Sequence, residues 1–262
     1  MNMGEMTALV TGANSGIGFA ICGELAKRGC SLLMVSNDKD GLKQAAFNLE
    51  SVYGIKPGVY NIDLAKKGSA KELFEYCLKK KITVSILVNN AGIFFFKDVI
   101  NTPKKLVKKI INLHNYTPVM LTRLFIRQMI KENRKGYILN MASVSSRMMM
   151  PGIALYSATK SFLRCFSRAM RNEVFDKGIS ITTISPGAVE TGLYNLPSRY
   201  LKLGKFFGVI LTPEKLASQA VKKMFKRKAE YIPGAFINRL FIFIVVILPE
   251  KLVRFIKKKL PG

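Results

Sequence analysis

The strongest constraint on the fold is an alternation of two kinds of segment between Met6 and Ile184. Short apolar runs predict strands, and the longer amphipathic runs between them predict helices. Apolar strands joined by helices form parallel sheets, because right-handed crossovers place the helices on both faces. We therefore expect an α/β fold with a Rossmann-like doubly wound parallel sheet. The expected strands are 7–11, 31–35, 58–62, 85–90, 137–143 and 180–185, and the expected helices are 16–28, 40–52, 66–80, 104–132 and 155–176.

Length and composition favour one domain. The chain has 262 residues, of which 49% are hydrophobic, and this is enough to bury one substantial core. No linker rich in proline, glycine or serine divides the sequence. We expect a single domain over 1–230, followed by a hydrophobic and basic C-terminal tail over 231–262.

The cysteine pattern and the N-terminus predict the compartment. The four cysteines lie far apart and include no Cys-x-x-Cys pair, which suits neither zinc nor a disulfide framework. The N-terminus enters the first expected strand without the basic and long apolar regions of a signal peptide. We therefore expect a cytoplasmic protein that is not secreted and that has no metal site.

The formal net charge of +26 is large for a chain of this size. It is compatible with nucleic-acid binding, with attraction to an anionic membrane surface or acidic ligand, and with a solvated basic exterior. Nucleic-acid modules pair basic residues with a groove-reading element or stacking aromatic side chains, and we identify none in the sequence. We expect no nucleic-acid partner and leave the other two explanations open.

The segment LYSATKSF, residues 155–162, carries a tyrosine and a lysine four positions apart in a helix-prone stretch. One helical turn of about 3.6 residues puts Tyr156 and Lys160 on the same side. The pair is either an ordinary surface contact or a catalytic pair. In the second case the ammonium group lowers the pKa of the phenol from about 10, so that it exchanges protons with a carbonyl or alcohol oxygen.

Small and polar residues follow the other expected strands, and each has a plain alternative as a turn or cap. TGANSGIG (11–18) opens the first helix, where glycines let the backbone approach a pyrophosphate. NNAG (89–92) follows the fourth strand, Ser143 ends the fifth, and SPGAVETG (185–192) follows the sixth. Asn112 lies within an expected helix, where its amide either bends the helix, holds a water near Lys160, or is exposed and idle.

In their order and approximate spacing, these motifs resemble those of the short-chain dehydrogenase/reductase family over roughly residues 5–195. The resemblance implies a Rossmann fold and hydride transfer between a nicotinamide and a carbonyl or alcohol. It implies that Tyr156 is the acid/base and that Ser143 binds the substrate oxygen. It also implies that Lys160 holds the nicotinamide ribose and lowers the pKa of the tyrosine, and that Asn112 supports a proton relay. The implied cofactor-binding residues are Gly12, Asn14, Ser15, Gly16, Ile17, Gly18, Ser36, Asn37, Lys39, Asp63, Leu64, Asn90, Ala91, Gly92, Tyr156, Lys160, Pro186, Gly187, Val189 and Thr191.

The end of the second expected strand bears on cofactor preference. NAD-preferring proteins carry an acidic residue there that binds the ribose 2′-hydroxyl, and this chain has Ser36 followed by Asn37. Lys39 is close enough in sequence to meet a 2′-phosphate. Asp38 is the alternative, because a shift of one residue would give it the NAD role. We favour NADP(H) over NAD(H).

The last third of the chain predicts the substrate class. The segment 194–211 is rich in leucine, phenylalanine and tyrosine and is expected to form a mobile lid over an apolar ligand, or else to pack on the body. The apolar run 240–248 has nine residues, short of the roughly 20 that span a bilayer. With the basic segment 251–260 it resembles the ends of lipid-ketone reductases, as an interfacial membrane anchor or as a dimer or core helix.

We therefore expect an NAD(P)(H)-dependent reductase of a lipophilic ketone, of the long-chain oxoacyl or sphingoid type. A hydroxysteroid dehydrogenase is the alternative within this class. A non-catalytic, cofactor-binding, membrane-associated protein is the alternative from another class, and a homodimer is compatible with each. His114, the sole histidine, is interpreted as a packing or surface residue.

Overall fold

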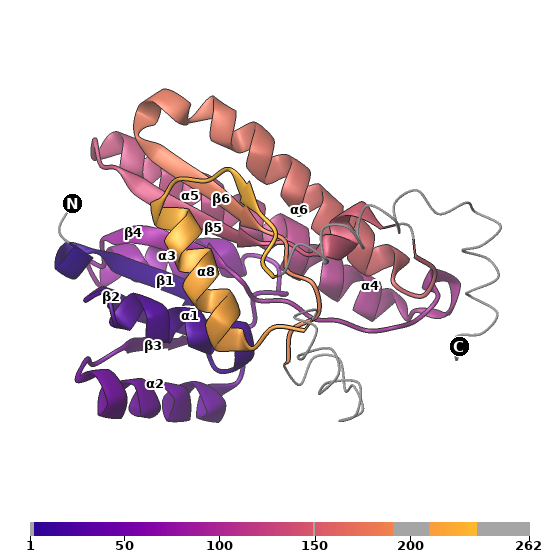
Figure 1. Ribbon diagram of the computed structural model, residues 1–262, viewed down its shortest axis with the longest axis horizontal. Coiled ribbons are helices and arrows are strands. Elements are labelled where there is room, and N and C mark those ends of the chain that lie inside the picture. The colour runs from indigo at the N-terminus through magenta and orange to yellow at the C-terminus, as the bar shows by residue number, and fades with distance from the viewer. Residues whose placement is uncertain (1–2, 149, 191–209, 235–262) are drawn as a thin grey trace.

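The computed structural model describes residues 3–148, 150–190 and 210–234. Its centre is a seven-stranded sheet in the order β3-β2-β1-β4-β5-β6-β7, and every neighbouring pair is parallel (Figure 1). The order reverses between β1 and β4, which is where ligands bind in doubly wound sheets. The predicted fold class is confirmed. The strands are β1 (Thr7–Thr11), β2 (Ser31–Ser36), β3 (Gly58–Asn61), β4 (Val84–Asn89), β5 (Gly136–Met141), β6 (Ile179–Ile184) and β7 (Glu230–Tyr231).

Helices cover both faces of the sheet (Figure 1). Those of one face are α1 (Gly16–Ala26), α2 (Lys39–Tyr53) and α8 (Pro213–Phe225), and those of the other are α3 (Ser69–Lys79), α5 (Thr117–Lys131) and α6 (Ala154–Glu173). Helix α4 (Lys104–Ile111) precedes α5. Short 3₁₀ turns are η1 (Met3–Glu5), η2 (Val99–Asn101), η4 (Val144–Arg147) and η5 (Phe175–Lys177).

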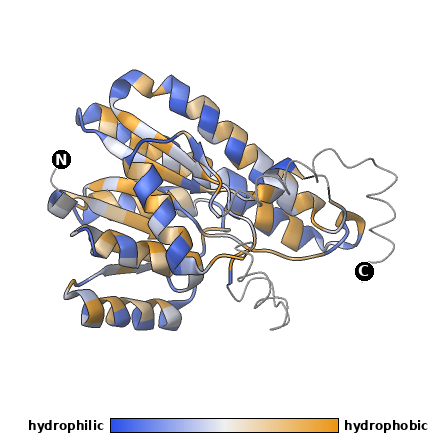
Figure 2. Ribbon diagram, in the orientation of Figure 1, coloured by the Kyte–Doolittle hydropathy of each residue, from blue (hydrophilic) through white to orange (hydrophobic). Residues whose placement is uncertain are grey.

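Strand β1 shows why the strands are apolar throughout. Ala8 and Val10 pack in the core shared with α1, α2 and α8, whereas Leu9 between them packs in the core shared with α3 and α5. Successive strand residues point to opposite faces, and both faces are buried here. Figure 2 shows the consequence: hydrophobic colour concentrates in the strands, while the surrounding helices carry both colours.

Two features differ from the sequence-based expectation. The helix expected over 104–132 is interrupted by a π-helical turn, η3 (Asn112–Tyr116), between α4 and α5. Helix α8 and strand β7 extend the fold beyond the elements expected before residue 185, and β7 crosses the expected domain boundary at 230. The lid and the tail lie outside the described residues, except for 210–211 and 231–234.

None of the helices within the described part of the chain is both long enough and apolar enough to cross a membrane.

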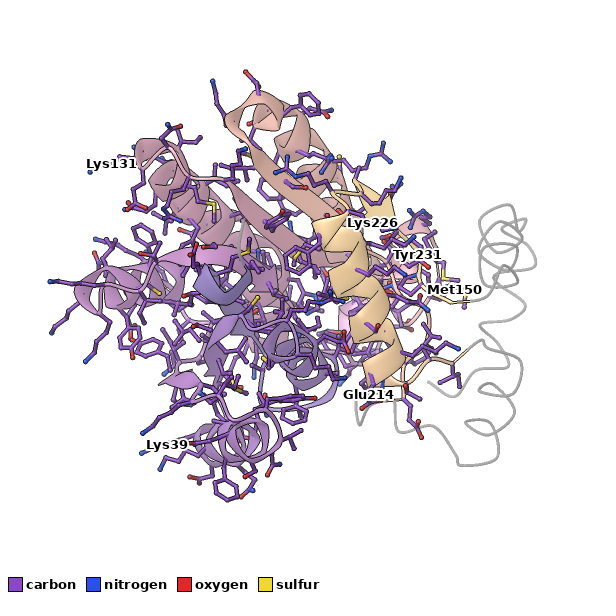
Figure 3. The ribbon with its side chains drawn as sticks, turned by 60° about the vertical axis from the view of Figure 1, so that its left-hand side comes forward. Lys39, Lys131, Met150, Glu214, Lys226 and Tyr231 are labelled. Atoms are coloured by element: carbon purple, nitrogen blue, oxygen red, sulfur yellow. The ribbon has the colours of Figure 1, made fainter. Side chains whose placement is uncertain are left out.

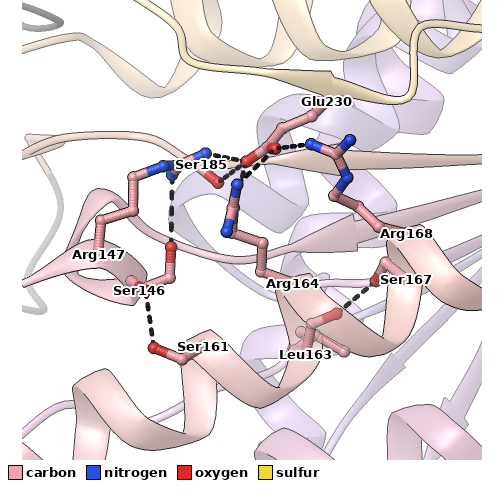
Figure 4. Close-up of polar contacts among 9 residues, drawn as sticks. All are labelled: Ser146, Arg147, Ser161, Leu163, Arg164, Ser167, Arg168, Ser185 and Glu230. Atoms are coloured by element: carbon pink, nitrogen blue, oxygen red, sulfur yellow. Dashed lines mark hydrogen bonds and ion pairs between the residues drawn. The ribbon is translucent and has the colours of Figure 1, made fainter.

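A charged cluster fastens the edge strand β7 to its neighbours (Figure 4). Glu230 is bound by Arg164 Nε at 2.7 Å, by Arg168 Nη1 at 3.2 Å and by Arg147 of η4. Burial acts to raise the pKa of Glu230, but the hydrogen bond from Arg164 and the charge of Arg147 outweigh it and hold the pKa below its usual value. One carboxylate therefore joins β7, α6 and the turn that follows β5.

Basic side chains of several elements lie on the exterior. Lys39, Lys131 and Lys226 lie at the periphery of the molecule, at or next to the ends of α2, α5 and α8 (Figure 3). These positions belong to separate elements on both faces of the sheet.

Candidate active site

A cavity of about 530 Å³ opens at the carboxyl ends of the strands. Loops that follow β1, β2, β3, β4, β5 and β6 line it together with α4, η3 and α6. The structure thus brings together nearly all of the predicted site residues. Those that line the cavity are Gly12, Asn14, Ser15, Gly16, Ile17, Gly18, Ser36, Asn37, Asp63, Leu64, Asn90, Ala91, Gly92, Ser143, Tyr156, Lys160, Pro186, Gly187 and Val189.

The glycine-rich loop is held by its own backbone and by the loop after β4. Asn90 Nδ2 donates to the carbonyls of Thr11 at 3.0 Å and Gly12 at 3.3 Å. A Cβ at Gly18 would lie 1.9 Å from the Gly12 carbonyl oxygen and 2.6 Å from Asn90 Nδ2. Glycine at 18 therefore lets α1 begin directly against the turn, with the amides of its first residues at the cavity.

At the end of β2, Ser36 and Asn37 line the cavity and Asp38 does not. Asp38 is the N-cap of α2: its Oδ1 accepts from the Gly41 amide at 3.0 Å, and its Oδ2 accepts from Asn14 Nδ2 at 3.1 Å. Ser36 Oγ donates to Asn14 Oδ1 at 2.9 Å. Both carboxylate oxygens of Asp38 are thus used within the protein.

Tyr156 and Lys160 lie on α6 and face the same cavity, as their spacing predicts. Both are buried, at 7% and 5% exposure. Lys160 Nζ donates to the Met141 carbonyl at 2.8 Å and lies 5.7 Å from the centroid of the Tyr156 ring. Burial lowers the pKa of Lys160 to about 8. The Lys160 ammonium group thus lies near the Tyr156 ring, in a buried position that disfavours its charged form.

Ser143 follows β5 and joins the same cavity. It is 5% exposed, and its Oγ accepts a hydrogen bond from the Ser145 amide at 3.2 Å as the N-cap of η4. Its hydroxyl hydrogen remains available as a donor when the oxygen is the acceptor. A serine hydroxyl, a phenol and an ammonium group therefore line the same cavity.

A profile of the family described as short chain dehydrogenase matches residues 6–198. The chain belongs to this family. The cavity that is lined by the start of α1 and by Tyr156 is the candidate active site of this short-chain dehydrogenase.

Curated relatives of this short-chain dehydrogenase include 3-oxoacyl reductases. A very-long-chain 3-oxoacyl-CoA reductase from Anas platyrhynchos is 35% identical over 189 residues, which cover 70% of this chain and 60% of the relative. The 3-oxoacyl-[acyl-carrier-protein] reductase FabG from Buchnera aphidicola is 32% identical over 239 residues, or 89% of this chain and 95% of the relative. The chain thus spans less than two thirds of the duck relative.

Solved structures support the fold. A 7beta-hydroxysteroid dehydrogenase has a TM-score of 0.85 at 23% identity and covers 97% of this chain and 99% of its own. A short-chain dehydrogenase from Sphingobium yanoikuyae in complex with NADPH has a TM-score of 0.78 at 22% identity. The match covers 98% of this chain and 97% of that structure.

Three predicted site residues are not placed at the cavity. Asn112 begins the π-helical turn, and its Nδ2 donates to the Ala65 carbonyl at 3.1 Å. The described cavity lining includes His114 but not Asn112, so the relay role of Asn112 stays a prediction. Lys39 is exposed and absent from that lining. Thr191 lies outside the described residues.

Residues that the sequence did not reveal also line the cavity: Ile62, Ile93, Lys109, Leu113, His114, Met141 and Ala142. Most of them lie one or two positions from a predicted residue. Their place next to a motif could therefore have indicated that they line the cavity. Lys109 had no such signal, since it lies three residues before the predicted Asn112. His114 lies two residues after Asn112, within the π-helical turn that the sequence did not reveal. His114 was interpreted as packing or surface, and it is buried at 1% exposure.

Proposed function

We propose that this short-chain dehydrogenase is an NADP(H)-dependent reductase of a lipophilic ketone, of the long-chain oxoacyl or sphingoid type. The observation that carries the proposal is that Tyr156, Lys160 and Ser143 line one cavity with the start of α1. An acid, a cation and a hydroxyl donor thereby share one cavity with a helix N-terminus that can bind an anion.

The residues present fit a nicotinamide dinucleotide. The absence of a Cβ at Gly18 leaves the N-terminus of α1 open beside the turn, and Ser15, its N-cap, makes no side-chain cap, so the first amides of α1 are free to bind a pyrophosphate. Asp63 and Leu64 would flank the adenine, and Lys160 would hold the nicotinamide ribose. When bound, the cofactor supplies the hydride that reduces the ketone.

The chain's own groups supply the proton chemistry. Tyr156 would donate a proton to the carbonyl oxygen as that oxygen gains negative charge, and Ser143 would donate a hydrogen bond to the same oxygen. Lys160 would stabilise the phenolate that remains. Because burial lowers its pKa to about 8, Lys160 is mostly protonated at neutral pH, and the reductive rate is expected to fall as pH rises through this value.

Aromatic residues beside Tyr156 support an apolar substrate. Phe94, which follows NNAG, packs edge-on against the Tyr156 ring with centroids 5.0 Å apart. Phe96 of the same loop and Ile100 of the following turn η2 are exposed at 45% and 91%. These apolar side chains near Tyr156, and the oxoacyl activities in the names of the relatives, favour a long-chain oxoacyl substrate over a short polar one.

The hydrogen bonds of Asp38 support the preference for NADP(H). An NAD-type carboxylate must reach the ribose hydroxyls, yet Asp38 is not among the residues that line the cavity. Its hydrogen bonds from Gly41 and Asn14 hold the carboxylate at the start of α2. Ser36 and Asn37, which line the cavity, carry no negative charge to repel a 2′-phosphate.

The test is oxidation of NADPH and of NADH by the full chain with four ketones: a 3-oxoacyl thioester, a sphingoid ketone, a steroid and a short diketone. We expect turnover with NADPH and a long-chain ketone, and its loss in Tyr156→Phe with NADPH affinity retained. Turnover of the steroid alone would favour the hydroxysteroid alternative. NADPH binding without any turnover would favour the non-catalytic alternative.

Membrane contact and dimerisation belong to the same proposal and depend on the tail. A variant that ends at residue 235 separates the two by vesicle co-sedimentation and size-exclusion chromatography. Loss of binding to anionic vesicles at unchanged molecular size supports an anchor, whereas a smaller size supports a dimer element.

A further inference from the structure

His114 has contacts that the proposed chemistry leaves unexplained. It lies in the π-helical turn η3, is 1% exposed, and lines the cavity. Its ring meets the Tyr156 ring edge-on, with centroids 5.7 Å apart and an interplanar angle of 76°. The sole histidine of the chain therefore touches the residue proposed as the proton donor.

The hydrogen bonds of the ring assign its protons. The backbone amide of Ile93 can only donate, so His114 Nε2, at 3.0 Å, is the acceptor and carries no proton. Nδ1 lies 3.0 Å from Thr159 Oγ1, and Thr159 donates its own hydroxyl hydrogen to the Tyr156 carbonyl at 2.8 Å. Nδ1 must therefore carry the hydrogen and donate it to Thr159.

The surroundings keep this ring neutral. Burial, and then the charge of Lys160, lower the pKa of His114 well below its usual value. Lys160 and Tyr156, both on α6, are the titratable groups that face it among the described residues. A proton on Nε2 would also point at the Ile93 N–H and break that hydrogen bond.

The approach of the two segments is close. A Cβ on Gly92 would lie 2.9 Å from His114 Nε2, so the loop after β4 meets the ring where only glycine fits without a shift. Through Ile93 on one side and Thr159 on the other, the imidazole joins this loop to α6 at the turn that carries Tyr156.

We propose that His114 is a neutral positioning residue. In its Nδ1–H form it braces the loop after β4 against α6 and fixes the place of Tyr156 in the cavity, without carrying a proton in the reaction. The kinetic part of this inference rests on the proposed reductase function. The structural part of the inference, which is the protonation state of the ring, is independent of that function.

The first test reads the ring directly. Since His114 is the only histidine, ¹⁵N-labelled full-length protein without a histidine tag gives a single imidazole in long-range ¹H–¹⁵N spectra. We expect one protonated nitrogen, identified as Nδ1 by its couplings, from pH 8 down to at least about pH 6, below which an ordinary histidine would be mostly charged. An Nε2–H form or a doubly protonated ring at pH 7 would overturn the assignment.

The second test separates the two hydrogen bonds by kinetics on a 3-oxoacyl thioester. His114→Gln keeps an acceptor near Nε2, His114→Asn keeps a donor near Nδ1, and His114→Phe keeps the ring but neither bond. We expect kcat to fall about 100-fold in His114→Phe, as for a misplaced catalytic group, and less in the two amide variants, with little change in the KM for NADPH.

A kcat of His114→Phe equal to that of the wild type would contradict the positioning role of His114. A wild-type pH–rate profile that follows the titration of His114 would instead make the residue a proton carrier. If His114→Phe does not fold, Thr159→Val removes the partner of Nδ1 from the other side, and a fall in kcat is again expected. If no ketone is turned over, the proposed function fails while the spectrum still decides the state of the ring.

Discussion

At the scale of single residues, the buried charge of Lys160 lowers the stability of the fold but serves the proposed function. Burial lowers its pKa from 10.5 to about 8, so at neutral pH the fold keeps a charge that water would hold better. This shift corresponds to about 3 kcal/mol. Lys160→Met relieves the cost but leaves the Met141 carbonyl without its donor, a loss of about 1–2 kcal/mol. We expect a variant about 1–2 kcal/mol more stable and at least about 100-fold less active.

Urea unfolding at several pH values checks this account. Between pH 8 and 10.5 the unfolded wild-type chain binds more protons than the folded one, so wild-type stability contributed by Lys160 rises with pH. The advantage of Lys160→Met should therefore shrink as pH rises through this window. An advantage that does not change with pH would show that the buried charge is not its source.

Ser36 gives a second prediction at this scale. Its position at the cavity and at the end of β2 suits contact with the ribose. We expect Ser36→Asp to lower kcat/KM for NADPH, because a carboxylate repels the 2′-phosphate, and to raise it for NADH. The ratio of the two kcat/KM values, with Lys39→Ala as the control, measures the change. If Lys39→Ala changes the ratio and Ser36→Asp does not, the 2′-phosphate binds at the start of α2 and not at the end of β2.

At the scale of elements, the junction of β1 and α1 depends on Gly18. A Cβ there would lie 1.9 Å from the Gly12 carbonyl. Gly18→Ala should therefore displace the start of α1 and weaken NADPH binding at least about 10-fold. Gly23→Ala is the matched control on the same helix, because its Cβ would meet only the end of the Tyr53 side chain, at 3.3 Å. Fluorescence titration with NADPH compares the two, and equal affinities would contradict the role of Gly18.

The same scale shows what the sequence can and cannot predict. Motifs at strand ends were found because a parallel sheet brings the carboxyl ends of all its strands to one edge, and Ser143 and Asn90 lie there as expected. The place of His114 at the cavity was missed because the expected regular helix over 104–132 contains five π-helical residues. A π-turn rotates the face of the helix, and no residue type announces it.

At the scale of the whole molecule, the edge of the sheet depends on Glu230 and its three arginines. Glu230→Gln leaves those guanidinium groups without their counter-charge, and we expect a loss of about 2–3 kcal/mol. Glu75→Gln, which breaks an exposed pair with Lys71, should change stability by less than about 0.5 kcal/mol. Urea unfolding at neutral pH compares them.

Acid should remove the contribution of Glu230. The folded-state pKa of this carboxyl lies below its ordinary value of 4.5, so its stabilisation is present above that value and is lost as pH falls through the folded pKa. The difference between wild type and Glu230→Gln should close in this range. A difference that persists in strong acid would mean that lost packing, rather than charge, destabilises the variant.

The most direct test of the central claim follows the label from NADPH deuterated at C4, in both stereoisomers, during reduction of a long-chain 3-oxoacyl thioester. The account predicts a 3-hydroxyacyl product that carries one deuterium from one of the two stereoisomers with wild type, and no product with Tyr156→Phe. An unlabelled product, or labelled product formed equally well by Tyr156→Phe, would contradict it.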